Sequence, residues 1–493
     1  MFKRVVLIFL LVFVQQFTFA QSVKLAAVFT DHMVLQRDKP VTIYGRANAN
    51  AAVEATFNQI TLHTTANPEG KWALVFPKMP HGGPYQLQVQ SRQSDIILKD
   101  ILIGDVWLCS GQSNMEFPLN QSATGMAELA QLKENPLLRI MKFKNAAETN
   151  NQGWDSLTLA RVNNFDYFEG EWLPVNSHTA KTFSAVAYYF GKNITAETQV
   201  PVGLIQMAVG GSPIESWIDG AVLLQDPQVS GILTGWRTSA MLQDWVRDRT
   251  DVNLKHARSP DQHHPFEPGY NYQAGIAALT AFPIKGVIWY QGESNAQDAA
   301  QYEKTFPVLV NSWRKQWADD FPFYYVQLSS LDRPLWPEFR DAQRRLQLNI
   351  PNTGMAVSLD LGDSLDVHPK RKKEVGERLA LLALKDTYHQ AVKANGPMVS
   401  TATLKHNEIV ISFKENDKLF TRDQMSLKGF ELLTAKGKRL KPVNATIVNN
   451  QVLLSIPKGQ QIKKVWYAWQ PFTRANLVNK AGLPASTFSI SLP

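Results

Sequence analysis

The chain has 493 residues, of which 51 are Lys or Arg and 43 are Asp or Glu, so its formal net charge at pH 7 is +8. This excess is mild for the length, and apart from residues 370–373 the basic residues form no dense cluster, which argues against a nucleic-acid-binding protein. The only cysteine, Cys109, excludes intramolecular disulfides, and its apolar neighbours favour a buried thiol. The length suggests about two to four domains.

Residues 1–20 have the layout of a secretory signal peptide. Two basic residues come first, an apolar run covers 5–14, and the small residue Ala20 ends the segment. The alternative is a membrane anchor, but a spanning helix needs about 20 apolar residues, and two glutamines interrupt this run. We therefore expect cleavage after Ala20, export of the chain, and no membrane span in the mature protein.

Residues 21–100 consist of short apolar segments separated by turn residues, which is typical of a small β-sandwich-like domain. Segments such as WALVFP and YQLQVQ are bounded by turn signals at 67–70 and 81–84. The same pattern returns near the end of the chain in EIVISF and QVLLSI, so residues 396–493 are predicted to form a second β-rich domain. Neither domain shows an evident binding stripe.

Residues 101–395 alternate instead between apolar strands and amphipathic helices. The predicted strands are ILIGDVWLCS, LRIMKF, LIQMAV, GVIWYQ, FYYVQL and MAVSLD, and the predicted helices cover 183–197, 299–318, 339–348 and 372–386. Near-continuous apolar strands that alternate with helices predict a parallel sheet covered by helices on both faces. The polar stretches 144–180 and 219–268 are expected to be long loops around a site.

Four polar segments directly follow strands of this predicted sheet. They are Gly111–Glu116, Gly210–Pro213, Gln291–Asn295 and Asp363–Pro369. Ligands of open α/β sheets bind beyond the carboxyl ends of the strands, so we expect these segments to converge on one edge of the sheet.

The side chains of these segments suit acyl transfer. Ser113, at a strand-to-helix turn, is the expected nucleophile, and His368, in the loop before the last helix, is its expected base. The backbone N–H groups of Ser113 and Gly211 and the side-chain amide of Asn295 are expected to stabilise the oxyanion. Each residue alone is more often a cap or a turn residue, so the prediction depends on their combination.

At these residues the sequence resembles the sialate O-acetylesterase family, within the SGNH hydrolase superfamily. The resemblance rests on WLCSGQSNM at 107–115, GGSPIESW at 210–217, WYQGESN at 289–295 and DVHP at 366–369, with DHMVLQ at 31–36 similar to the N-terminal β domain of the family. It implies an SGNH-type three-layer α/β/α parallel-sheet hydrolase core with flanking all-β domains. It also implies hydrolysis of sugar acetyl esters through an acetyl-serine, without a metal or cofactor, with Ser113, Gly211, Asn295 and His368 as the four superfamily residues.

The identity of the acid that would complete a catalytic triad stays open. The superfamily often places this acid three residues before the histidine, but that position is Leu365 in this chain. Asp366 is the nearest replacement, Glu293 at the adjacent strand end is a rival that relatives are thought to use, and Asp363 is a third candidate. Since a triad acid orients one imidazole, only one of them is expected to be essential.

The resemblance implies that the substrate is 9-O-acetylated sialic acid. The candidate contacts to the sugar are Gln112, Glu116, Gln291 and Trp217. Acetylated xylan or another acetylated polysaccharide is the alternative substrate. A non-catalytic carbohydrate-binding protein is the alternative from another class, and the joint retention of Ser113, Asn295 and His368 argues against it.

No metal site is expected, because the adjacent pair His263 and His264 lacks the spacing of metal ligands. The sequence does not indicate an oligomeric state. The occurrence of the family in Gram-negative bacteria that degrade glycans predicts a periplasmic or secreted protein.

Overall fold

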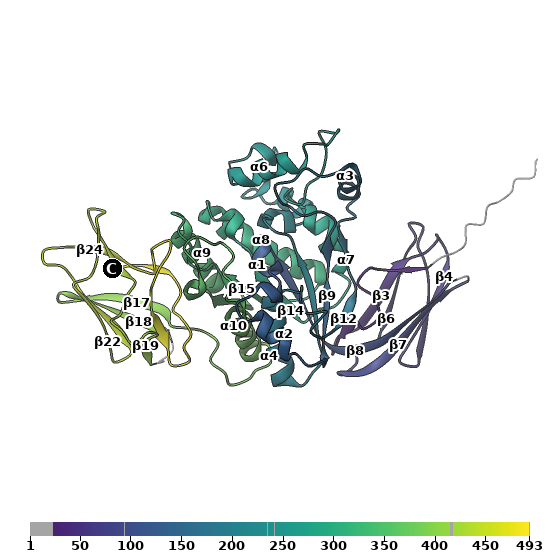
Figure 1. Ribbon diagram of the computed structural model, residues 1–493, viewed down its shortest axis with the longest axis horizontal. Coiled ribbons are helices and arrows are strands. Elements are labelled where there is room, and N and C mark those ends of the chain that lie inside the picture. Colours follow the sequence, from purple (N-terminus) through teal and green to yellow (C-terminus); the bar gives the residue numbers. More distant parts are fainter. Residues whose placement is uncertain (1–22, 93, 234, 241, 415–417, 493) are drawn as a thin grey trace, which may run out of the picture.

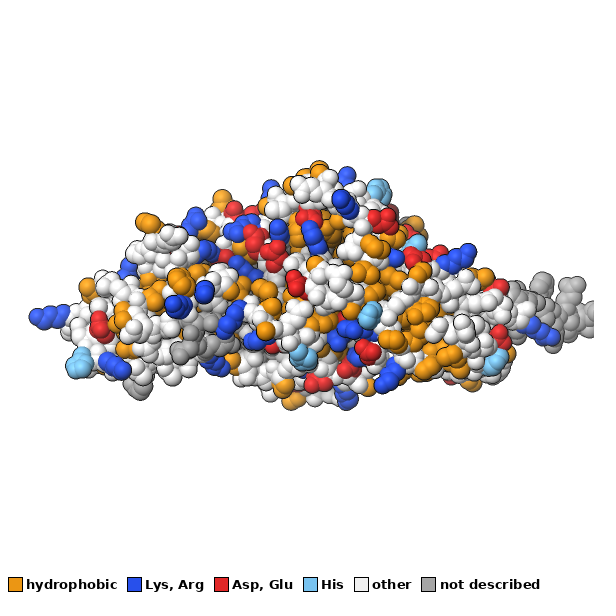
Figure 2. Space-filling view, turned by 90° about the horizontal axis from the view of Figure 1, so that it is seen from below, with side chains coloured by type: hydrophobic (Ala, Val, Ile, Leu, Met, Phe, Trp, Pro, Cys, Tyr) orange, Lys and Arg blue, Asp and Glu red, His pale blue; other side chains and the backbone are white. Residues whose placement is uncertain are grey.

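The computed structural model describes residues 23–492 except positions 93, 234, 241 and 415–417, so the expected signal peptide lies outside the described residues. Three parts lie side by side along the long axis: a β sandwich, a central α/β part and a second β part (Figure 1). Within the described ranges, no helix combines the length and apolar character that crossing a bilayer needs. Figure 2 shows positive and negative side chains interspersed over the face that it presents.

Two sheets form the N-terminal sandwich. The first has the order β1 (Lys24–Leu25), β3 (Val41–Arg46), β6 (Lys71–Phe76), and the second the order β5 (Ile60–Thr65), β4 (Ala52–Phe57), β7 (Gly82–Ser91), β8 (Ser94–Gly111), β2 (Val34–Gln36). In β6 exposed and buried residues alternate, because successive side chains of a strand point to opposite faces. Trp72, Leu74 and Phe76 therefore fill the space between the sheets.

Strand β8 belongs to both the sandwich and the central sheet. Its first part pairs with β7 and β2, and its second part runs parallel to β13 (Val202–Ala208) and β14 (Gly286–Tyr290). Every residue from Ile101 to Gly111 is buried. The expected domain boundary at residue 100 thus falls inside a continuous strand, because one chain segment supplies hydrogen bonds to both sheets.

The central sheet has seven strands, in the order β12, β9, β13, β8, β14, β15, β16. The strands not yet introduced are β9 (Asn135–Lys142), β12 (Trp172–Val175), β15 (Phe323–Gln327) and β16 (Thr353–Val357). All neighbours are parallel except β12 and β9, which are antiparallel. The α/β core with added β structure is confirmed, but the sheet is mixed, since the segment expected to be loop at 144–180 contributes the antiparallel edge strand β12.

Helices cover both faces of this sheet. Trp107 of β8 packs edge-on against Phe190 of α4 (Ala185–Thr198), and Trp289 of β14 packs edge-on against Trp313 of α8 (Ala299–Trp317). Trp289 is level with Ser110, three residues beyond Trp107, so the two tryptophans point to opposite faces.

Helix α10 (Lys372–Asp386) packs on α4, and α9 (Trp336–Asn349) packs on α8. The other α-helices of the described ranges are α1 (Ser113–Glu116), α2 (Gly125–Gln131), α3 (Ser156–Asn163), α5 (Gly220–Gln225), α6 (Asp244–Asn253) and α7 (Ala277–Leu279). Helices α3 and α6 form a cap over one end of the central part (Figure 1). The two stretches expected to be loops, 144–180 and 219–268, therefore carry short helices and a short strand pair, β10 (Lys144–Asn145) with β11 (Phe168–Glu169).

The C-terminal part also contains two four-stranded sheets. One has the order β17 (Met398–Lys405), β18 (Glu408–Lys414), β23 (Gln451–Ser455), β22 (Asn444–Val448), the other the order β21 (Arg439–Leu440), β20 (Phe430–Thr434), β24 (Ile462–Tyr467), β26 (Phe488–Ser491), and β19 (Leu419–Thr421) pairs with β25 (Leu477–Asn479). Ile411, Leu432, Val465 and Phe488 belong to a core separate from that of the rest of the molecule.

Arg340 of α9 connects the central part to this C-terminal part. Its fully buried guanidinium donates hydrogen bonds to the backbone carbonyl oxygens of Ala468, Gln470 and Pro471 at 2.7–3.0 Å. Burial lowers the pKa of Arg340 to about 9. The cation is therefore compensated by neutral oxygen atoms.

We expect Arg340→Met to lower the apparent free energy of unfolding by about 3 kcal/mol, because the hydrogen bonds from the buried guanidinium to three backbone carbonyl oxygens are lost. Thermal and urea unfolding, followed by limited proteolysis near residues 468–471, measure the effect. Arg46→Met is the matched control, since Arg46 is exposed at the end of β3. An unfolding midpoint for Arg340→Met equal to that of the control would contradict this role.

Candidate active site

A tight turn places Ser113 at the carboxyl end of β8. Gly111 has φ +136°, and a Cβ there would lie 2.2 Å from the carbonyl oxygen of Tyr290 on β14. Only glycine fits this approach. The chain then enters α1 at Ser113, at the point where β8 has β13 on one side and β14 on the other. The connection after β8 leads to β9, on the β13 side, whereas the connection after β13 leads to β14 on the other side of β8. Ligands of open α/β sheets bind where the connections change direction in this way.

His368 lies in the loop between β16 and α10 and contacts the serine directly. Its Nε2 is 2.8 Å from Ser113 Oγ. Burial lowers the pKa of His368, the positive charge of Lys372 lowers it further, and Asp366 opposes both. The imidazole is thus mostly neutral near pH 7, the form that can accept a proton from a hydroxyl.

The three candidate acids occupy different positions around His368. Asp366 Oδ1 accepts a hydrogen bond from the His368 backbone N–H at 2.8 Å and lies 3.8 Å from ring Nδ1. Among the residues that the structure describes, it is the only carboxylate paired with this ring. Asp363 Oδ1 accepts from the N–H groups of Leu365 and Asp366, so it shapes the loop. Glu293 faces Asn114 instead.

Asn114, the residue after the serine, connects three segments of the site. Its Nδ2 donates to Glu293 Oε1 and to the carbonyl oxygen of Val367, 3.0 Å away, and its Oδ1 accepts from the Nζ of Lys372. Val367 precedes His368, so this one side chain ties the serine turn to the histidine loop and to the end of β14. The sequence had singled out Asn114 only as part of a motif.

Lys372, at the start of α10, is fully buried behind the site. Its Nζ lies 4.8 Å from the ring centroid of Phe117 and 5.4 Å from that of Tyr290, which suits a cation. Burial lowers the pKa of Lys372 to about 7, and the charge of Glu293 acts in the opposite direction. Burial in turn raises the pKa of Glu293, whose Oε2 has no partner among the described residues. The burial of Lys372 could not be inferred from the sequence, because a lysine at the start of a helix is usually exposed.

The residues expected to stabilise the oxyanion separate into two groups. Gly211 lines the same cavity as Ser113, and its φ of +77° favours glycine. Asn295, by contrast, is buried outside the cavity lining: its Nδ2 donates to both carboxylate oxygens of Glu215 at 3.0–3.2 Å, and its Oδ1 accepts from the Ile214 N–H. The expected placement of the Asn295 amide beside Ser113 is therefore wrong in this structure, because Glu215 takes its donors.

Gln112, the residue before Ser113, carries an amide side chain that lines the same cavity. Its Oε1 accepts from the Gly292 N–H at 3.3 Å and from the Ser294 hydroxyl at 3.4 Å. Gln112 lines the cavity, and its Nε2 has no hydrogen-bond partner among the described residues. The two hydrogen bonds to Oε1 orient the Gln112 amide, and its Nε2 can donate a hydrogen bond to a ligand.

The other expected sugar contacts differ in position. Glu116 lines the cavity, where burial raises its pKa to about 7 against the opposing charge of Lys142. Gln291 is fully buried and donates to the Ser212 carbonyl and to Asn295. Trp217 is a core residue, packed edge-on against Trp289. Neither Gln291 nor Trp217 lines the cavity, so both were wrongly expected to contact a sugar.

The Ser113–His368 pair opens into a cavity of about 700 Å³. Much of its remaining wall comes from the polar stretches 144–180 and 219–268, which contribute Asn145, Glu148, Thr149, Asn150, Asn151, Trp245 and Arg249. Arg333 and Val367, from later in the chain, also line it. Most of these residues offer hydrogen-bond donors or acceptors, as a sugar requires. The sequence did not single out these residues individually, although most of them belong to the stretches that were expected to be loops around a site.

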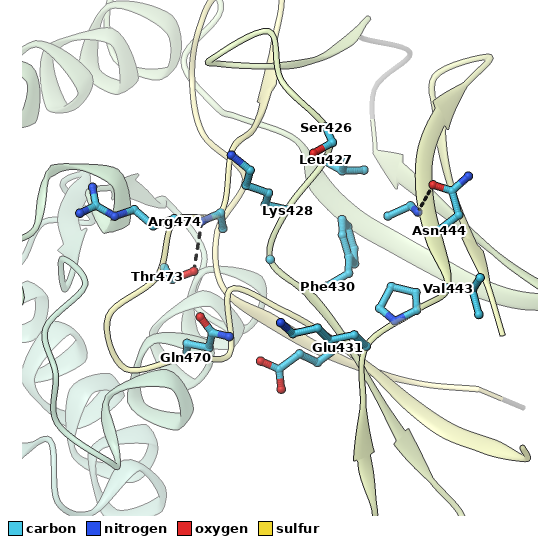
Figure 3. A pocket seen from close by; sticks show the side chains of 15 residues that line it. Ser426, Leu427, Lys428, Phe430, Glu431, Val443, Asn444, Gln470, Thr473 and Arg474 are labelled. Atoms are coloured by element: carbon cyan, nitrogen blue, oxygen red, sulfur yellow. Dashed lines mark hydrogen bonds between the residues drawn. The ribbon is translucent and has the colours of Figure 1, made fainter. Parts of the chain in front are cut away.

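A second cavity, of about 430 Å³, lies in the C-terminal part (Figure 3). Ser426, Lys428, Glu431 and Arg474 line it, but its described lining contains no histidine that could activate the serine. Ser113 is therefore the better candidate for a nucleophile.

The adjacent residues His263 and His264 have different partners and do not form one metal site. His263 Nδ1 is 2.8 Å from Glu267 Oε2, while the fully buried His264 stacks on Trp154 and contacts Asn253. Across the described ranges, no cluster of three or more potential metal ligands was found.

Comparison with known proteins connects this geometry to one family. The family model described as carbohydrate esterase, sialic acid-specific acetylesterase, matches residues 103–232 and 261–385, which include Ser113, Gly211, Glu293 and His368. The sialate O-acetylesterase of Rattus norvegicus is 28% identical over 504 residues, covering 90% of this chain and 89% of the relative. That of Homo sapiens is 27% identical over 490 residues, covering 90% and 87%.

A solved structure agrees with these sequence relatives. A carbohydrate acetylesterase from Xanthomonas citri superposes with a TM-score of 0.79 at 30% identity, over 95% of this chain and 99% of that chain. The similarity therefore extends through both flanking β parts. The chain belongs to the carbohydrate esterase family of sialic acid-specific acetylesterases.

Proposed function

We propose that this protein is a carbohydrate O-acetylesterase that removes acetyl groups, in particular the 9-O-acetyl group, from sialic acid. The observation that carries the proposal is the 2.8 Å contact between Ser113 Oγ and His368 Nε2 at a polar cavity, within the motifs of a sialic acid-specific family. The relatives named sialate O-acetylesterase support the choice of sugar.

In the proposed mechanism, Ser113 Oγ attacks the acetyl carbonyl carbon while His368 Nε2 takes the hydroxyl proton. The tetrahedral intermediate collapses, His368 gives the proton to the sugar oxygen, and the free sugar hydroxyl leaves. A water molecule then attacks the acetyl-serine, with His368 again as base. Acetate leaves and Ser113 regains its proton. The chemistry is that of an SGNH-type hydrolase core and calls on no cofactor.

We assign oxyanion stabilisation to the backbone N–H groups of Ser113 and Gly211 and to the Nε2 of Gln112. Three donors aimed at one point stabilise the charge that develops on the carbonyl oxygen. Gln112 is supported by its fixed Oε1 and its place in the cavity wall. In this proposal Gln112, and not Asn295, provides the side-chain donor to the oxyanion.

Asp366 is the proposed triad acid, because it alone is paired with the His368 ring among the described residues. A modest rotation of its half-exposed carboxylate would close the 3.8 Å gap to Nδ1. Glu293 is proposed as a positioning residue that holds Asn114, and through it the histidine loop. Export to the periplasm or the medium is proposed from the signal-peptide pattern of residues 1–20.

Ser113→Ala should lower kcat on both p-nitrophenyl acetate and 9-O-acetylated sialic acid at least about a thousandfold, because the nucleophile is lost. Ser110→Ala, which removes a buried hydroxyl without a partner among the described residues, should retain activity near that of the parent. A parent active on the small ester alone would redirect the substrate to xylan or another acetylated glycan. A parent inert to all esters would support the carbohydrate-binding alternative.

Asp366→Asn should lower kcat about a hundredfold, whereas Glu293→Gln should lower it less than about tenfold, since an amide at 293 still accepts from Asn114. Steady-state kinetics on p-nitrophenyl acetate at matched folded concentration compares the two. Equal modest losses would contradict a triad with Asp366 as its single acid.

Lys372→Met should shift the acid limb of the kcat/KM profile to higher pH. Activity requires neutral His368 and therefore rises as pH passes the pKa of that ring, which the Lys372 charge lowers. Removing the charge raises the pKa, while Asp366→Asn should shift the limb in the opposite direction. The midpoint is compared with that of Lys373→Met, a half-exposed neighbour. A midpoint for Lys372→Met that stays in place or falls would exclude this coupling.

A further inference from the structure

The cavity beside Ser113 contains a cation without a carboxylate partner. Arg249, in α6, lines the cavity, and burial alone lowers its pKa, with no acidic group among the causes. No described carboxylate forms an ion pair with it, although most other partly buried arginines of the molecule bind an acid, as Arg37 binds Asp105. A positive charge in a half-buried wall is costly unless an anion joins it.

The guanidinium of Arg249 is held in place by neutral groups. Its Nε donates to Asn151 Oδ1 at 3.2 Å, its Nη1 donates to the Thr149 carbonyl at 3.3 Å, and its central carbon lies 5.2 Å from the ring centroid of Trp245. Its Nη2 has no hydrogen-bond partner among the described residues. The contact with Trp245 and the two hydrogen bonds hold the guanidinium and leave N–H donors for a carboxylate ligand.

The groups that support Arg249 also contact the segment beside the serine. The Thr149 hydroxyl donates to the Gly210 carbonyl at 2.6 Å, and a Cβ at Gly211 would lie 3.2 Å from the Trp245 ring. Arg249 is one helical turn beyond Trp245, which places the two side chains on the same face of α6. The groups that hold Arg249 therefore also contact Gly210 and Gly211, beside which the ester carbonyl is proposed to bind.

We propose that Arg249 forms a carboxylate subsite, which binds the acid group of an acetylated acidic sugar while the acetyl ester lies at Ser113. The inference rests on the proposed function and deepens it. Sialic acid carries its carboxylate at one end and its glycerol-like side chain, with the 9-hydroxyl, at the other. Because Arg249 and Ser113 line the same cavity, the proposal places the carboxylate end of the sugar at Arg249 and the 9-O-acetyl end at Ser113. Xylose units of acetylated xylan carry no such group.

The test compares kcat/KM for 9-O-acetylated sialic acid, its carboxyl methyl ester and p-nitrophenyl acetate. The parent should prefer the free acid over the methyl ester about tenfold or more, mainly through KM, since a charged hydrogen-bond partner is lost in the ester. This measurement needs no variant. Arg249→Gln should remove that preference, and its loss on the free acid should exceed its loss on p-nitrophenyl acetate about tenfold.

Arg258→Gln is the matched control, because it removes the same charge from an exposed position outside the cavity lining. It should keep the preference for the free acid. O-acetylated galacturonic acid, assayed in parallel, distinguishes a sialic acid from a uronic acid as the source of the carboxylate. A parent that cleaves the free acid and the methyl ester equally, or equal losses of Arg249→Gln on all substrates, would overturn the subsite. A parent inert to every ester would overturn the proposed function instead.

Discussion

The arrangement of the molecule depends on the close approach of β8 and β14 at the end of β8. The absence of a side chain at Gly111 lets the backbone pass the Tyr290 carbonyl, and the chain can then turn into α1 with Ser113 at its first position. The same strand begins in the N-terminal sandwich, where it pairs with β7 and β2. A continuous ladder of hydrogen bonds thus fixes the serine relative to two sheets at once. On such a support the proposed nucleophile needs little reorganisation before reaction.

Buried polar groups form a second layer beneath the serine. Asn114 joins Lys372, Glu293 and the backbone before His368, and the aromatic faces of Phe117 and Tyr290 surround the lysine. Burying a lysine and a carboxyl group opposes folding unless each finds polar partners. Burial accordingly lowers the pKa of Lys372 and raises that of Glu293. Part of the folding free energy is therefore used to keep the loop that carries His368 in one place.

Much of this architecture could be predicted from the sequence, because apolar runs followed by glycine-rich polar turns specify parallel strands with their ligand-binding ends together. That logic places Ser113 and His368 on one edge, although 255 residues separate them. It fails for side-chain direction: whether the Asn295 amide faces the cavity depends on Glu215, a residue from another segment. It also fails for Trp217, whose burial depends on Trp289 and other core rings. The antiparallel strand β12 was missed because Trp172–Val175 is short and lies in a polar stretch.

The junction between α9 and the C-terminal part has chemistry unlike that of the site. Arg340 remains protonated below its lowered pKa of about 9, and its three partners are peptide oxygens, which do not titrate. Around Ser113, in contrast, Lys372 and Glu116 both have pKa values of about 7. Acidification from neutral pH therefore changes the charges of Lys372 and Glu116 near Ser113. Arg340 stays protonated over the same range and keeps its hydrogen bonds to the C-terminal part. The contact between the two parts is therefore insensitive to changes of pH near neutrality that alter the charges around Ser113.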